Sequence, residues 1–504
     1  NLSLELGAPL VTTPEGTINC KFWGLGADGT VGANKNSIKI IGDNTDMYAQ
    51  AYFDYDSKKS GGVTMSHLRF GHSPIKSTYL IRTANFVACH NPAYVRKYNM
   101  VQELVDGGTF LLNCPWDMEG IEKHLPGQVK AFIANHNIKF YVIDGIKIGK
   151  EIGLGGRINT VLQSAFFKLA NIIPEEHAIE LMKAAAKASY GKKGDKIVQM
   201  NYDAIDAGAK QVVEIEVPES WKDAEDEGLF TPQVKGGRED VVDFVKNIQA
   251  KVNAQEGNSL PVSAFTEYVD GTTPSGSSAY EKRGIAVDIP VWQPENCIQC
   301  NRCAYVCPHA VIRPIALTEE EAANAPEGMD MIDMMGMPNM KFSIAVSAYD
   351  CTGCGSCANV CPGKKGEKAL VMGNMEENAG KQTFFDYGRE IPVKPEVVAK
   401  IQRRRQVKGS QFKQPLLEFS GACAGCGETP YAKLITQLFG DRMYIANATG
   451  CSSIWGNSSP STPYTVNPQG EVRHGLTHCL RIMQSLDMVC FLHRIRSVKD
   501  SKHL

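Results

Sequence analysis

Residues 297–308 (CIQCNRCAYVCP) and 351–362 (CTGCGSCANVCP) carry the most specific pattern in this chain. Each run spaces four cysteines as C-x2-C-x2-C-x3-C and places a proline after the last one. Two-residue gaps let three thiolates wrap around one corner of an iron–sulfur cubane, whereas the fourth thiolate starts away from that corner and reaches another cluster. The doubled run therefore predicts a small domain that holds two [4Fe–4S] clusters.

The crossed position of the fourth cysteine predicts two ligand sets. One cluster is expected to take three cysteines of the first run and the last of the second, namely Cys297, Cys300, Cys303 and Cys361. The other cluster is expected to take Cys351, Cys354, Cys357 and Cys307. Paired CxxC motifs also make four-cysteine zinc sites. A doubled run with a proline after each fourth cysteine is hard to explain as zinc, so iron–sulfur clusters are favoured.

A third cysteine group follows in residues 421–428 (GACAGCGE) and 447–453 (NATGCSS). It contains Cys423, Cys426 and Cys451, one thiol short of an all-cysteine cluster. From the motif alone, a structural zinc site, a redox CxxC pair and an incomplete cluster site remain open alternatives.

The composition places the chain among ordinary proteins of several domains. Its 504 residues suggest about three or four domains, and 43% hydrophobic and 21% charged residues are typical of globular proteins. A formal net charge of -2 gives no basic bias toward nucleic acid. No apolar run is long enough to span a membrane. Clustered cysteines without a secretion signal indicate metal ligands in a reducing compartment, and a start without Met suggests a truncated sequence.

The first 200 residues alternate strand and helix patterns. Strands are expected at 78–82, 109–113 and 139–143, and helices at 158–169 and between Pro174 and Gly191. This alternation predicts an α/β domain with a largely parallel sheet. Cys20, Cys89 and Cys114, which lie in this part, are expected to be buried packing residues.

The remaining segments are less regular. Residues 200–290 read as a polar connecting segment with one helix near 238–250. The Met-rich stretch 327–342 is expected to be an adaptable loop that packs beside the clusters, with a partner-docking loop as the alternative. The basic stretch 399–414 is expected to be a solvated linker.

Several of these stretches resemble one family. Residues 419–431 (FSGACAGCGETPY) and 447–456 (NATGCSSIWG) resemble the thiamine-diphosphate domain of pyruvate:ferredoxin oxidoreductases. Residues 278–292 (SAYEKRGIAVDIPVW) resemble the connecting segment of that family, and residues 24–42 and 55–71 resemble its γ-type, coenzyme-A-associated domain. The resemblance covers about residues 1–470 in family order.

The resemblance implies a multidomain α/β protein with an inserted small α+β ferredoxin-like 2[4Fe–4S] domain. The expected parts are a γ-type domain at 1–200, a connecting segment with an EKR-type motif at 201–290, the ferredoxin-like domain at 291–372, a linker at 373–414 and a partial thiamine-diphosphate domain at 415–470.

The resemblance also implies a function: oxidative decarboxylation of pyruvate with coenzyme A to acetyl-CoA and CO2. Electrons would pass through a proximal [4Fe–4S] cluster and the two ferredoxin-like clusters to ferredoxin or flavodoxin. It makes Cys423, Cys426 and Cys451 proximal-cluster ligands, places Glu428 near the thiamine diphosphate and its Mg2+ as the catalytic candidate, and assigns Thr449 to cofactor binding.

The Gly-rich loop near the start has two interpretations. Gly24-x-Gly26-x-x-Gly29 matches a dinucleotide fingerprint, but the match alone is weak, and a plain Gly-rich turn after a strand is the simpler reading. The resemblance instead implies that this loop faces the phosphates of coenzyme A. The residues expected to face those phosphates are Gly29, Thr30, Lys58, Lys59 and Arg157. For the lysine pair, simple solvation is the alternative.

The resemblance implies that the family's first two domains, the downstream Mg2+ and diphosphate segment and a fourth proximal cysteine lie outside this sequence, so the chain alone is expected to be inactive. From about Gly470 the pattern stops. The observed 470–485 (GEVRHGLTHCLRIMQS) and a family-like GRGPAWANSLFEDNAE fit one nucleotide stretch read in neighbouring frames. A frameshifted tail at 471–504 is therefore expected, with a diverged terminus as the alternative, and Cys479 and Cys490 are not expected to be ligands.

Two other functions remain open: a non-catalytic iron–sulfur electron carrier, and the same chemistry on another 2-oxoacid. The third cysteine group favours an enzyme, because a pure carrier has no use for it. The family further implies a homodimer when complete, with no nucleic acid partner, located in the cytoplasm or in the hydrogenosome of an anaerobic eukaryote.

Overall fold

The computed structural model describes residues 12–26, 28–59, 61–228, 237–269, 271–402, 407–440, 443, 445, 450–458 and 460–467. These residues form two compact units. One unit consists of Ser3–Asp56 and Gly61–Thr231, and the other is mainly Pro232–Leu504 with the short segment Ser57–Ser60. Thr449 and the tail predicted to be frameshifted, 471–504, lie outside the described residues. No helix in the described part is long and apolar enough to cross a membrane.

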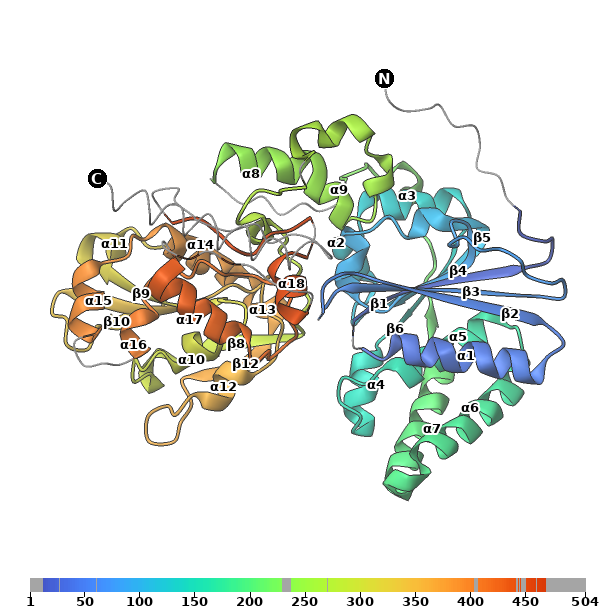
Figure 1. The fold of residues 1–504 in the computed structure, drawn as a ribbon. Helices are drawn as coiled ribbons and strands as arrows, with labels where there is room; N and C mark the ends of the chain where they lie inside the picture. The colour runs from blue at the N-terminus through green and yellow to red at the C-terminus, as the bar shows by residue number, and fades with distance from the viewer. Residues whose placement is uncertain are drawn as a thin grey trace. The chain divides into compact units, whose positions relative to one another are not determined.

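The first unit, here called the sheet unit, is built on a seven-stranded sheet (Figure 1). The strand order is β2-β3-β1-β4-β5-β6-β7. Its strands are β1 (Ile18–Leu25), β2 (Tyr48–Tyr55), β3 (Val63–Gly71), β4 (Ala84–Cys89), β5 (Leu104–Asn113), β6 (Lys139–Ile143) and β7 (Val213–Glu214). Its helices are α1 (Thr30–Asn44), α2 (Met118–His124), α3 (Gly127–Asn135), α4 (Gly145–Ile152), α5 (Asn159–Ala170), α6 (Glu175–Tyr190) and α7 (Asp195–Lys210).

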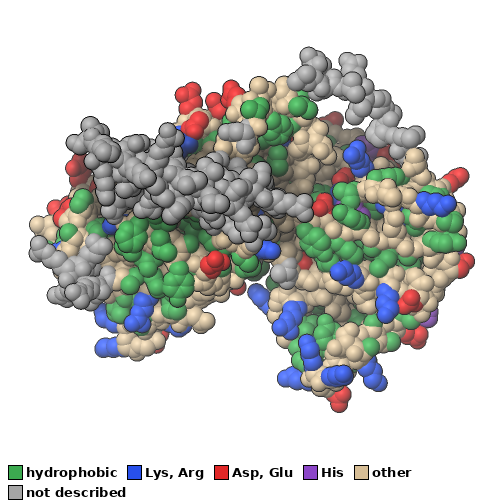
Figure 2. All heavy atoms as spheres, in the orientation of Figure 1, with side chains coloured by type: hydrophobic (Ala, Val, Ile, Leu, Met, Phe, Trp, Pro, Cys, Tyr) green, Lys and Arg blue, Asp and Glu red, His purple; other side chains and the backbone are tan. Residues whose placement is uncertain are grey.

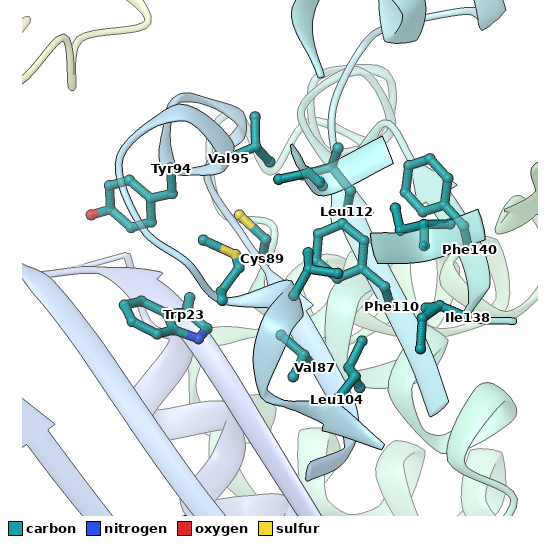
Figure 3. Packing of buried hydrophobic residues seen from close by; sticks show 14 of the residues in the cluster. Trp23, Val87, Cys89, Tyr94, Val95, Leu104, Phe110, Leu112, Ile138 and Phe140 are labelled. Carbon is teal, nitrogen blue, oxygen red and sulfur yellow. The ribbon is translucent and has the colours of Figure 1, made fainter. Parts of the chain in front are cut away.

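Side chains that alternate along the central strands build a core on each face of this sheet. On β4, Val87 and Cys89 join the core under α2 and α3, whereas Phe86 and Ala88 join the core under α1, α5, α6 and α7. Figure 3 shows the first of these cores, in which Phe110 and Phe140 stack with ring centroids 5.5 Å apart. The unit is therefore a three-layer α/β/α arrangement.

The structure confirms several expected elements of this unit. Strands occur at 109–113 and 139–143, helix α5 covers 159–170, and α6 starts after Pro174 and ends before Gly191. Cys20, Cys89 and Cys114 are buried, as expected.

Three expectations for this unit are corrected. The sheet is mixed rather than largely parallel, because β2–β3, β3–β1 and β6–β7 pair antiparallel. Residues 78–82 form no strand: Tyr79 O accepts from Arg69 Nη2 at 2.7 Å and Ile81 N donates to His67 Nδ1 at 3.2 Å, so side chains replace a strand ladder. Helix α7 spans the boundary expected at residue 200, and the unit continues to Thr231.

The second unit, here called the cluster unit, contains small sheets and short helices. A three-stranded sheet has the order β10-β11-β9, and β12 pairs with β8. The strands are β8 (Asp288–Trp292), β9 (Ile312–Thr318), β10 (Ile332–Asp333), β11 (Met340–Val346) and β12 (Leu370–Asn374). The helices are α8 (Glu239–Phe244), α9 (Ala250–Asn253), α10 (Arg302–Val306), α11 (Glu319–Ala323), α12 (Ser356–Val360), α13 (Met375–Asn378), α14 (Gln382–Glu390), α15 (Pro395–Gln402), α16 (Val407–Ser410), α17 (Thr429–Phe439) and α18 (Cys451–Gly456).

Irregular segments expected in this unit are more ordered than the sequence suggested. The Met-rich stretch contains β10 and the start of β11, and Met329 and Met334 are buried in the core around the cysteine runs. In the basic stretch 399–414, α15 and α16 occupy most of the described residues and Gln411 is buried, which differs from the solvated linker expected there. Residues 403–406 lie outside the described residues. The helix expected near 238–250 is present as α8 and α9, joined by one π-helical segment, Val245–Gln249.

Candidate iron–sulfur centre

The eight cysteines of the two runs line two cavities of the cluster unit. Four of them line one cavity, namely Cys297, Cys300, Cys303 and Cys361. The others line a second cavity, namely Cys307, Cys351, Cys354 and Cys357. These are the two crossed sets that the spacing predicts, and they are here called the first and second cysteine sets.

Both runs fold in the same way because both carry left-handed backbone at matching positions. In the second run these positions are Gly353 (φ 67°) and Gly355 (φ 72°), which suit this conformation. The first run has Gln299 (φ 52°) and Asn301 (φ 59°) there, and buried hydrogen bonds compensate for the strain. Gln299 Nε2 donates to Asp333 O at 2.7 Å, and Asn301 Nδ2 donates to Lys408 O at 3.1 Å.

Backbone N–H groups point at the cysteine sulfurs. Gln299 N donates to Cys297 Sγ at 3.4 Å, and Gly353 N makes the same bond to Cys351 Sγ at 3.4 Å. Ala369 N lies 3.3 Å from Cys361 Sγ. Such bonds stabilise negative charge on sulfur and tune the potential of a bound cluster.

Burial makes these thiols costly to ionise in the absence of a cation. Burial raises the pKa of Cys351 to about 12, and it raises the pKa of Cys303 and Cys357 further. Coordinated iron would offset this cost, because metal binding and thiol deprotonation are coupled. Within the described ranges no three His, Cys, Asp or Glu side chains are grouped to hold a single metal ion. The four thiols of each set line one shared cavity, and this arrangement fits a cluster.

The third cysteine group is only partly described. Cys423 and Cys451 are exposed and Cys426 is half-buried, and Cys426 N donates to Cys423 O at 3.0 Å in a tight turn. Cys451 starts α18, whose Trp455 Nε1 donates to the exposed Glu428 carboxylate at 3.3 Å. This bond brings the two segments of the motif together.

The turn with Cys423 and Cys426 lies against the second cysteine set. A Cβ atom placed on Gly425 would lie 3.7 Å from the Cβ of Cys354. The buried ring of His309, two residues after Cys307, is linked to Ser420 O through Nδ1 at 3.1 Å. The third group is therefore adjacent to the second set.

The Gly-rich loop of the sheet unit connects β1 to α1. Asp28 closes it by accepting from Leu25 N and Thr30 N, both at 2.7 Å. Thr30 is buried, and its hydroxyl lies 2.7 Å from His90 Nδ1. A Cβ on Gly29 would lie 3.1 Å from Asn159 Cγ, so the exposed Arg157 is in a neighbouring turn. Gly29, Thr30 and Arg157 are thus brought to one end of the sheet.

Lys58 has a partner that the sequence did not suggest. It belongs to the cluster unit, where its Nζ pairs with a Glu281 carboxylate oxygen at 3.0 Å, with side chains 5% and 6% exposed. Ser461 Oγ donates to the same carboxylate. The charge of Lys58 is therefore buried and paired here, and its expected role at a phosphate stays a prediction. Lys59 is exposed, and its backbone N donates to Gly421 O at 2.9 Å.

Known proteins share this sequence over most of its length. The chain is 55% identical over 460 residues to a pyruvate-flavodoxin oxidoreductase of Enterobacter agglomerans, and 56% identical over 471 residues to a pyruvate:ferredoxin oxidoreductase of Moorella thermoacetica. Residues 19–211 match the family "Pyruvate ferredoxin/flavodoxin oxidoreductase". The chain is homologous over most of its length to pyruvate:ferredoxin and pyruvate-flavodoxin oxidoreductases.

Other matches cover further parts of the chain. Residues 296–365 match a 4Fe-4S dicluster domain, and residues 233–286 match a domain of unknown function. A pyruvate dehydrogenase [NADP(+)] of Cryptosporidium parvum is 48% identical over 479 residues and aligns with 90% of this chain. The first two relatives align with 91% and 93% of the chain, which spans 38% and 39% of their own lengths and 24% of the third.

Sequence reasoning missed one residue of this candidate centre. Lys433 of α17 is buried, and its Nζ donates to Ala304 O, to Tyr305 O at 3.2 Å and to Cys307 O at 3.2 Å. The only sequence signal is a lysine between apolar residues in 431–435 (YAKLI), and such a lysine is usually solvated.

Proposed function

We propose that this chain supplies the coenzyme-A-associated, electron-transfer and first thiamine-binding parts of an enzyme that oxidises pyruvate. That enzyme would convert pyruvate and coenzyme A into acetyl-CoA and CO2 and reduce ferredoxin or flavodoxin. The arrangement of the two cysteine sets around separate cavities carries this proposal. The sequence identity to named pyruvate oxidoreductases supports the choice of substrate and acceptor.

The cysteine sets would each hold one [4Fe–4S] cluster, with the third group contributing three ligands to a proximal cluster. Thiamine diphosphate, when bound with Mg2+, supplies the stabilisation of the carbanion. Glu428, which accepts a hydrogen bond from Trp455, would contact that cofactor. Thr449 would contribute to its binding.

The adjacency of the cysteine groups supports an order of electron transfer. The turn of Cys423 and Cys426 lies beside Cys354, so electrons would enter the second set first. They would leave through the first set, where Ile298 lies in the cavity wall and is 41% exposed. This order leads outward to a soluble acceptor.

The domain arrangement is part of the same proposal. The γ-type part would comprise about residues 1–200 with its extension to Thr231, followed by the connecting segment to 290. The ferredoxin-like domain at 291–372 would be inserted before the linker at 373–414 and the thiamine segment at 415–470. The homodimer and the compartment, cytoplasm or hydrogenosome, stay predictions.

A non-catalytic electron carrier is the second candidate function, and the match of residues 296–365 to a dicluster domain alone would favour it. The two functions differ in the third cysteine group, which only the enzyme needs.

Iron and acid-labile sulfide analysis tests the cluster assignment. The chain, purified anaerobically and reconstituted, is expected to bind about eight irons and about eight sulfides and to give EPR signals of two interacting [4Fe–4S]+ centres after dithionite reduction. About twelve irons would mean that the third group finds a fourth ligand. Zinc without sulfide would contradict the proposal.

Replacing Arg157 tests the coenzyme A assignment. Arg157→Gln is expected to weaken coenzyme A binding about tenfold or more, because a hydrogen bond to a charged group contributes about 1.5–3 kcal/mol. Isothermal titration calorimetry measures the change, and Lys187→Gln, an exposed cation on α6, is the matched control. Equal affinities in the two variants would contradict a phosphate-binding role for Arg157.

A further inference from the structure

The two cysteine runs form an internal repeat in which each short helix ends just before a crossing cysteine. Helix α10 ends at Val306 before Cys307, and α12 ends at Val360 before Cys361. The last carbonyl groups of any helix lack partners within the helix. Whatever binds these carbonyls therefore holds the crossing cysteine in place.

A lysine Nζ binds the end of each helix. At α12 the lysine is Lys368, which donates to Ala358 O at 2.5 Å and Asn359 O at 3.4 Å. Lys368 is exposed on the loop after α12, where Lys and Arg side chains gather in Figure 2.

At α10 the lysine is Lys433, whose Nζ donates to Ala304 O, Tyr305 O and Cys307 O. Lys433 is 2% exposed and lies 129 residues from Ala304 in the sequence. It belongs to helix α17 of the thiamine segment and lies outside both cysteine runs. Both lysines thus bind carbonyl groups at the end of a helix, but only Lys433 is buried and also binds the carbonyl of the crossing cysteine.

We propose that Lys433 is a positioning residue for both clusters, and this inference rests on the proposed cluster-binding function. The segment that it holds carries Cys303 of the first set and Cys307 of the second. One buried side chain of the thiamine segment therefore fixes one ligand of each cluster.

The same side chain places a cation beside the ligands of both clusters. Reduction adds one negative charge to a cluster, and a nearby positive charge in a buried environment stabilises that reduced form. Lys433 therefore favours the reduced state of both clusters. Lys368 binds the two equivalent carbonyl groups of α12 from an exposed position, where screening reduces its electrostatic effect.

The test compares Lys433→Met with Lys368→Met in the 504-residue chain, using iron and sulfide content and EPR-monitored redox titration. Lys433→Met is expected to lower the midpoint potentials so that the ratio of reduced to oxidised cluster falls about tenfold, which is 59 mV for a one-electron couple. Lys368→Met is expected to keep the wild-type potentials.

If Lys433→Met fails to assemble clusters, Lys433→Arg is the second variant, because it keeps a positive charge and hydrogen-bond donors at this position. Recovered iron content in Lys433→Arg, with normal assembly in Lys368→Met, would support the positioning role. Full iron content with wild-type potentials in Lys433→Met would overturn the inference, as would equal losses in Lys433→Met and Lys368→Met. An unmodified chain without iron or sulfide would instead contradict the proposed function, so the two failures are distinguishable.

Discussion

Replacing Cys297 and Cys361 together is expected to remove one cluster and leave the other, so that iron falls from about eight to about four atoms per chain. The two thiols are far apart in the sequence, yet both line the cavity of the first cysteine set. The second set keeps all four of its thiols in this variant. Iron and sulfide analysis with EPR after reduction measures the result.

The matched control takes both cysteines from one run. In a Cys351→Ala and Cys361→Ala double variant, each set loses one ligand, so both EPR signals should change. If each run held its own cluster instead, the two double variants would exchange their results. Cys114→Ala, at a buried cysteine in the sheet unit, should retain about eight irons.

Short-range spacing explains why the cysteine sets could be predicted from the sequence. Gaps of two residues restrict where neighbouring thiols can lie, and left-handed backbone at Gly353 and Gly355 bends the run around the cavity. In the first run, Gln299 and Asn301 take these positions only because distant backbone carbonyls bind their side chains. The spacing could be read directly, but these supporting contacts could not.

Helix α17 shows where the sequence pattern misleads. Its buried face carries Thr429, Lys433, Thr436 and Gln437 at helical spacing, whereas Tyr431, Ile435 and Phe439 are exposed. A polar stripe is normally assigned to solvent. Here Lys433 is buried because its Nζ donates to carbonyl groups at the end of α10, and Gln437 is buried where its amide donates to Lys413 O. No local pattern in 429–439 encodes these partners.

Long-range ion pairs could not be predicted for the same reason. Lys58 and Glu281 lie far apart in the sequence, and each alone reads as an exposed charge. The strand predicted at 78–82 is absent for a related reason. The composition of these residues is typical of a strand, but the side chains of Arg69 and His67 bind their backbone groups. In both cases partners from elsewhere in the chain decide the outcome.

Replacing Glu418 with glutamine is expected to lower the free energy of unfolding by about 3 kcal/mol, because it leaves two partly buried guanidinium groups without a counter-charge. Glu418 is 2% exposed and pairs with Arg313 of β9 and, at 3.3 Å, with Arg389 of α14. The ring of the next residue, Phe419, has Lys282, Arg313 and Arg389 within 4.8, 5.9 and 5.7 Å of its centroid. Urea denaturation followed by circular dichroism measures the loss.

The pH dependence of the Glu418→Gln effect separates a lost charge from a lost contact. Burial alone would raise the pKa of Glu418, but Arg313 and Arg389 outweigh it and hold the pKa below its usual value. The stabilisation is therefore complete above the unfolded pKa of about 4.3 and is lost as the pH falls through the lower folded pKa. The gap between Glu418→Gln and the unmodified chain should shrink in acid. Glu390→Gln, an exposed neighbour, should show no gap at either pH, and matching curves for the two variants would contradict the buried-charge role of Glu418.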